Sequence, residues 1–107
     1  MAVTTDEISD ICYEIVNNEF DTNGMDYDGN YVIFCIDSII TGSQDFKALV
    51  GKVEKDKIDE WLVGSYWKEE GALIDELVRV IDVKDLYKSI KAKDGGKLID
   101  VVFKLLN

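Results

Sequence analysis

The 107-residue sequence contains no histidine and no proline. Histidine is the side chain that most often transfers protons near neutral pH and the commonest metal ligand, so histidine-based catalytic triads and histidine-ligated zinc are excluded. The chain has only two cysteines, too few to complete a structural zinc site without histidine. It also lacks a glycine-rich phosphate loop, a nucleophile elbow and a metal motif. We therefore expect a protein that is not an enzyme and that holds no metal or cofactor.

Long apolar segments are also missing. The longest uninterrupted apolar run, residues 31–36, has six residues, whereas about 20 are needed to span a bilayer. The N-terminus lacks the basic and apolar regions of a signal peptide. Cys12 and Cys35 lie in apolar surroundings, so we expect buried, reduced thiols. These observations predict a cytoplasmic protein without a membrane segment.

Hydrophobic residues make up 47% of the sequence, a fraction too high for a disordered acidic chain. Apolar residues recur at three- and four-residue spacing in most of the chain, beginning with a helix over residues 5–20 that Thr4 and Glu7 would cap. Residues 43–53, 58–66, 73–81, 86–90 and 98–106 show the same pattern, while residues 94–97 (DGGK) are typical of a turn between helices. We predict an all-α fold, a single compact bundle of five to seven short helices, in one acidic globular domain over residues 1–107.

One segment is ambiguous. Residues 31–40 are rich in β-branched side chains and follow Asp28-Gly29, which favours a strand. No later stretch offers a convincing partner strand, and Asn30 and Gly42 could bound a short, wholly buried helix. The helix is the better prediction, and the alternative is an α+β fold with a small hairpin around residues 24–40.

Charge is distributed unevenly along the chain. The net charge is −10, and residues 1–46 contain ten carboxylates without a single Lys or Arg. The remaining 61 residues hold twelve charges of each sign and are formally neutral. Solvated helices usually intersperse both signs, so this unrelieved acidic half is the most informative feature of the sequence.

The acidic half predicts a surface that binds a basic protein. Glu7, Asp10 and Glu14 are spaced to lie on one face of the first helix, about 4.5 and 6 Å apart along its axis, close to the pitch of phosphates on a nucleic-acid strand. Such a face could occupy the basic groove of a nuclease or of a nucleic-acid-binding complex. The predicted binding residues are Glu7, Asp10, Glu14, Asp21, Asp26 and Asp28, with Trp67 as an apolar anchor and Trp61 assigned to the core.

Direct binding of nucleic acid is disfavoured, because the chain has one arginine and a net charge of the wrong sign. In size, acidity and single-domain form the chain resembles phage-encoded inhibitors of host defence and toxin-neutralising immunity proteins. That resemblance implies an inhibitor that acts as a nucleic-acid mimic.

Two alternatives remain open. Residues 26–37 resemble a degenerate EF-hand calcium loop, with oxygen ligands at positions one, three and five and Asp37 at position twelve, although Tyr31 replaces the usual glycine. The other alternative is a homodimer or larger self-assembly, in which the acidic half of one copy meets a Lys-rich segment of another. Its lysines are Lys84, Lys88, Lys91, Lys93 and Lys97.

Overall fold

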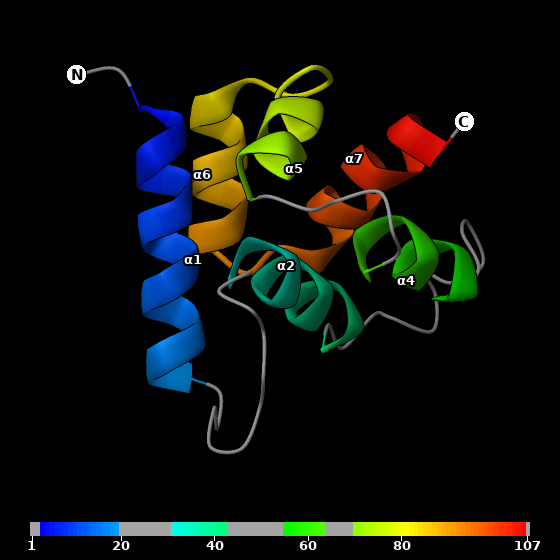
Figure 1. Cartoon of the computed structure of the whole chain (residues 1–107), viewed down its shortest axis with the longest axis horizontal. Helices are drawn as coiled ribbons and strands as arrows, with labels where there is room; N and C mark the ends of the chain where they lie inside the picture. The colour runs from blue at the N-terminus through cyan, green and yellow to red at the C-terminus, as the bar shows by residue number, and fades with distance from the viewer. Residues whose placement is uncertain (1–2, 20–30, 43–54, 64–69, 107) are drawn as a thin grey trace.

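Six helices and no strand make up the part of the chain that the computed structural model describes, which comprises residues 3–19, 31–42, 55–63 and 70–106 (Figure 1). The helices are α1 (Thr5–Glu19), α2 (Tyr31–Thr41), α4 (Lys55–Val63), α5 (Glu70–Leu77), α6 (Val83–Lys91) and α7 (Gly95–Leu106). The predicted all-α class and the predicted five to seven helices are confirmed. The helix expected over residues 43–53 lies outside the described residues.

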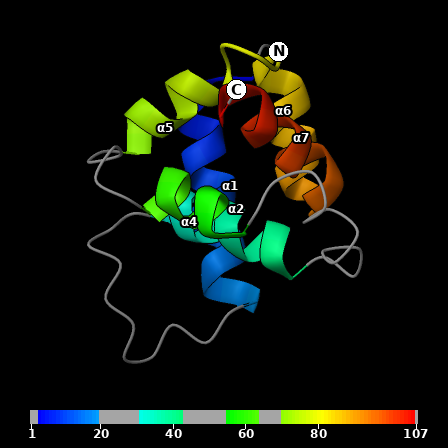
Figure 2. The ribbon, with the colours of Figure 1, turned by 90° about the vertical axis from the view of Figure 1, so that its right-hand side faces the viewer.

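Helix α2 lies at the centre of the bundle. It contacts α1, α4, α5 and α7. It lies between α1 and α4 in Figure 1, and in Figure 2 α4 lies in front of it and α1 behind it. Six of its eleven residues are buried, so apolar side chains are needed on most of its circumference. The helix predicted for residues 31–40 is confirmed.

The alternative hairpin is wrong, since residues 31–40 form a helix and not its second strand; residues 24–30 lie outside the described part. The reason is burial. β-Branched residues lose at most about 0.7 kcal/mol each relative to alanine in a helix. Full burial of a Val or Ile side chain contributes about 1.5–3 kcal/mol. The central position of α2 therefore outweighs the β propensity of its sequence.

The buried side chains of all six helices form one cluster. Its fully buried members are Ile8, Cys12, Val16, Val32, Cys35, Ile36, Ile40, Ile58, Leu73, Ile74, Leu77, Leu86, Ile90, Leu98, Ile99 and Val102. Cys12 and Cys35 are buried thiols that form no disulfide, as the sequence predicts.

Helix α6 packs against α1, and both helices start at the same end of the molecule (Figure 1). Asp82 caps α6, because its carboxylate accepts a hydrogen bond from the Lys84 amide at 2.9 Å. The helix ends at the turn before Lys93, whose φ of 54° lies in the left-handed region. Helices α1 and α6 thus form one edge of the bundle.

The boundary between α6 and α7 corrects the sequence analysis. Residues 94–97 were expected to separate two helices, but Gly95 and Gly96 are the first residues of α7. Asp94 starts this helix by accepting a hydrogen bond from the Lys97 amide at 3.0 Å. The turn between the two helices lies at Lys93, one residue before the expected turn. The cap formed by Asp94 compensates for the poor helix propensity of the two glycines, so α7 can begin at Gly95.

Candidate functional site

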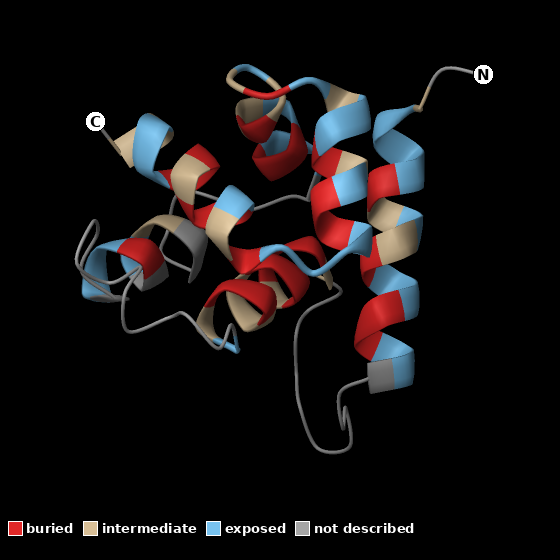
Figure 3. Ribbon diagram, turned by 180° about the vertical axis from the view of Figure 1, so that it is seen from behind, coloured by how far each residue is buried: buried red, intermediate tan, exposed pale blue. Residues whose placement is uncertain are grey.

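Helix α1 buries one side and exposes the other along its described length (Figure 3). Ile8, Cys12, Ile15 and Val16 are buried in the core, where α1 contacts α2, α5 and α6. The start of the helix is fixed by Thr4, whose hydroxyl accepts a hydrogen bond from the Glu7 amide at 3.3 Å. Core packing and this cap together determine which residues of α1 face solvent.

Four exposed carboxylates lie on the solvent side of α1: Asp6, Glu7, Asp10 and Glu14, which we call the acidic face. From Glu7 to Glu14 the face extends for about 10.5 Å along the helix axis. In the part of the chain that the structure describes, no amino or guanidinium nitrogen lies within 4.0 Å of these carboxylates. Among the described residues, therefore, no ion pair compensates their negative charge.

The acidic face does little to stabilise α1. Carboxylates at positions i and i+3 or i+4 repel each other, and Asp10 has three such neighbours in Asp6, Glu7 and Glu14. Asp6 and Glu7 in the first turn interact favourably with the helix dipole. The last turn, in contrast, carries no basic residue to complement the other end of the dipole. The repulsion within the acidic face therefore costs helix stability.

Tyr13 is an aromatic residue of this surface that the sequence analysis missed. Its side chain is 53% exposed, and its ring centroid lies 4.8 Å from that of Tyr31 at an interplanar angle of 66°. The side-chain amide of Asn17 donates a hydrogen bond to the backbone carbonyl of Tyr13 at 2.8 Å. The edge contact between α1 and the start of α2 limits the freedom of the Tyr13 ring beside Asp10 and Glu14. The sequence could have predicted that Tyr13 is exposed, because this residue falls outside the apolar stripe of α1.

Of the seven predicted binding residues, the structure brings together Glu7, Asp10 and Glu14. The other four lie outside the described residues: Asp21, Asp26, Asp28 and Trp67. Asp37, another carboxylate of the acidic half, is half-buried on α2 and does not belong to the acidic face.

Only residues 31–37 of the calcium-loop alternative, its positions six to twelve, lie in the described part of the chain, and they are helical. Tyr31 and Asp37, positions six and twelve of the proposed loop, both lie in α2. An EF-hand turns sharply at position six and uses the backbone carbonyl of position seven as a ligand. Positions one to five lie outside the described residues. Among the described residues no group of three or more His, Cys, Asp or Glu side chains is placed to hold a metal ion.

The lysines of α6 form a basic stripe beside α1. Lys84, Lys88 and Lys91 are exposed and follow each other at i, i+4 and i+7, which places them on one helix face. The ammonium of Lys91 lies 5.9 Å from the centroid of the Tyr87 ring. No ion pair involving these three lysines is formed within the described ranges. Opposite charges therefore lie on two neighbouring helices of one molecule.

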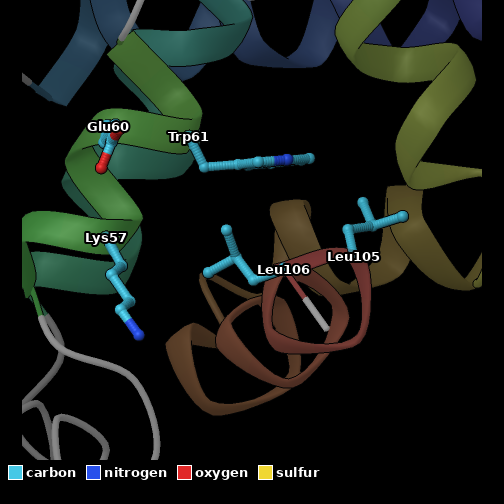
Figure 4. A pocket seen from close by; sticks show the side chains of 5 residues that line it. All are labelled: Lys57, Glu60, Trp61, Leu105 and Leu106. Atoms are coloured by element: carbon cyan, nitrogen blue, oxygen red, sulfur yellow. The ribbon is translucent and has the colours of Figure 1, made fainter.

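A pocket lies at the opposite side of the bundle, between α4 and the C-terminal turn of α7 (Figure 4). It is lined by Lys57, Glu60, Trp61, Leu105 and Leu106 and has a volume of about 330 Å³. The assignment of Trp61 to the core is only partly correct, because the side chain packs against the core but is half-buried and forms a wall of this pocket. The apolar stripe of α4 could not show that the indole would lie at the edge of the core beside Leu105 and Leu106.

None of the described helices combines the length and the hydropathy that a membrane-spanning helix requires. No protein family, curated protein or solved structure matches the chain.

Proposed function

We propose that this chain is a small protein-binding module without catalytic activity, which inhibits a basic partner by docking its acidic N-terminal half onto the partner's nucleic-acid-binding surface. The observation that carries the proposal is the acidic face of α1, four exposed carboxylates without a cation within 4.0 Å in the described residues. A nuclease or a nucleic-acid-binding complex has a positively charged surface that is complementary to this acidic face. In this role the chain would act as phage anti-defence and immunity-type inhibitors do.

Charge supports a basic protein as the partner. A net charge of −10 repels nucleic acid directly. The same charge attracts a surface rich in Lys and Arg and accelerates association through electrostatic steering. Such an encounter weakens as salt screens the charges.

Tyr13 would supply binding energy beyond the electrostatic attraction of the acidic face. Charge complementarity contributes more to specificity and association rate than to affinity, whereas aromatic side chains often carry much of the binding energy of an interface. Tyr13 lies beside Asp10 and Glu14, and its contact with Tyr31 restricts the ring before binding. We therefore assign Tyr13 the role of apolar anchor on the described part of the surface.

The test is elution by a nucleic-acid competitor. The full chain is immobilised and exposed to lysate of its native host, and bound protein is eluted with short duplex DNA or, separately, with an uncharged polymer. The proposal expects one basic nucleic-acid-handling protein to be released by DNA but not by the polymer. A bound protein that DNA fails to release, or a column that retains no basic protein, contradicts the proposal.

Self-assembly is a second candidate, which the basic stripe of α6 favours. Lys84 to Lys91 and Glu7 to Glu14 cover equal numbers of helical residues, so the two stripes have equal lengths. Light scattering at low and high salt tests this candidate. The Lys84→Glu, Lys88→Glu, Lys91→Glu variant should dissociate, and adding Glu7→Lys, Asp10→Lys and Glu14→Lys should restore assembly. A wild-type mass that corresponds to a monomer at low salt contradicts it.

A further inference from the structure

The basic stripe of α6 and the acidic face of α1 have matching spacings along their helices. The three lysines of the stripe are exposed and follow each other after four and then three residues, which places them at about 0, 6 and 10.5 Å along the axis. Glu7, Asp10 and Glu14 are exposed and follow each other after three and then four residues, at about 0, 4.5 and 10.5 Å. If the two helices face each other and point the same way, each lysine lies within about 1.5 Å of one carboxylate along the axis.

The two patterns also turn around their helices in opposite senses. At about 100° per residue, the stripe turns by about 40° over its first step and back by about 60° over its second. Counted from Glu7, the acidic face turns by about 60° in the other sense and then back by about 40°. The facing surfaces of two parallel helices meet as mirror images, so turns of opposite sense coincide. An antiparallel contact would instead place Lys88 and Asp10 on opposite sides of the interface.

Both charged faces point away from the core. The buried residues of α1 include Cys12 and Val16, and those of α6 include Leu86 and Ile90; each set lies on the side of its helix opposite to the charged face. Although α1 packs against α6, no ion pair joins the two faces among the described residues. Two outward faces of opposite charge cannot cover each other within one molecule, whereas a second copy can bring them together.

We propose that the basic stripe docks in parallel orientation onto the acidic face of a second copy and covers it. The pairs are Lys84 with Glu7, Lys88 with Asp10 and Lys91 with Glu14. Different helices of the two copies meet, so each copy keeps one charged face for a further copy. The proposal rests on the self-assembly candidate. It makes assembly a regulator of the proposed inhibitor, because a covered acidic face does not bind a basic partner.

Sedimentation velocity at low salt tests the pairing with two variants of equal net charge. One combines Lys84→Glu with Glu7→Lys, which keeps all three pairs attractive. The other combines Lys84→Glu with Glu14→Lys, which makes two of the three pairs repulsive. The first variant should assemble as the wild type does, and the second should need a concentration at least about fourfold higher. Both should keep the circular dichroism of the wild type.

Titration of the same two variants with the peptide hexalysine tests whether assembly covers the acidic face. At about ten times the concentration at which the first variant is half-assembled, it should bind hexalysine about three- to fivefold more weakly than the second, because most of its acidic faces are occupied.

Each failure has a different meaning. If Glu14→Lys rescues assembly as well as Glu7→Lys does, the parallel pairing is overturned while self-assembly stands. If the two variants bind hexalysine equally, the covering of the acidic face is overturned while that face remains a binding surface. A wild type that stays monomeric at low salt refutes the pairing and the self-assembly candidate together, and it leaves the partner released by DNA as a separate question.

Discussion

Replacing Asp10 by asparagine should stabilise the protein. Asp10 lies within one helical turn of Asp6, Glu7 and Glu14, and each like-charged pair at this spacing destabilises a helix by about 0.2–0.5 kcal/mol. Removing three such pairs gives a gain of about 0.6–1.5 kcal/mol. For a domain of this size the gain corresponds to a rise in Tm of roughly 3–8 °C. Asp10 lies beyond the first turn, so little interaction with the helix dipole is lost.

Urea unfolding followed by circular dichroism, in low salt and in about 1 M salt, measures this gain. Salt at that concentration reduces the screening length to about 3 Å, so the advantage of Asp10→Asn should shrink markedly. The control is Asp75→Asn, an exposed aspartate on α5 that has Arg79 and no carboxylate three or four residues away. Asp75→Asn should be neutral or slightly destabilising. An Asp10→Asn variant without a gain, or with a gain that is equal in both salts, would refute the repulsion argument.

Four further predictions concern the fold and the calcium alternative. Ile36→Ala should cost about 2–5 kcal/mol and Ile36→Val about 0.5–1.5 kcal/mol in urea unfolding, because Ile36 is fully buried on the central helix. Gly42→Ala should destabilise by about 1–3 kcal/mol, since a Cβ atom there would lie 2.7 Å from the Ser38 carbonyl oxygen; Gly71→Ala, with no atom within 4 Å of its added Cβ, should not destabilise. Asp82→Ala should cost about 0.5–2 kcal/mol through loss of the α6 cap, more than Asp85→Ala. Millimolar calcium should leave Tm unchanged, because positions six and seven of the proposed loop, where an EF-hand turns sharply, are helical; a rise that Asp26→Ala abolishes would support the calcium site.

The sequence predicts the helices with clear apolar periodicity. Helix α1 was expected over residues 5–20 and spans Thr5–Glu19. Residues 31–41 could not be assigned from periodicity alone, because a helix that contacts four others is apolar on most sides and loses its amphipathic pattern. The poor helix propensity of Gly95 and Gly96 predicts a break, whereas the cap formed by Asp94 lets α7 begin at Gly95.

The candidate site is predictable only in part. The 3.6-residue period of a helix predicts that Glu7, Asp10 and Glu14 lie on one face, and the structure exposes all three on the solvent side of α1. The position of Tyr13 against Tyr31 depends on how α1 packs against α2, which no local pattern encodes. The pocket beside Trp61 similarly depends on how α7 packs against α4.

The most direct test of the acidic face compares two variants that carry the same change in charge. One reverses Glu7, Asp10 and Glu14 to lysine, and the other reverses Asp56, Asp75 and Asp85, three exposed aspartates on other helices. The affinity of each variant for the partner released by DNA is measured alongside circular dichroism. The proposed function predicts that the first variant loses binding and that the second retains most of it, with both helical spectra unchanged. Equal losses would mean that only net charge matters, and they would contradict a binding site on α1.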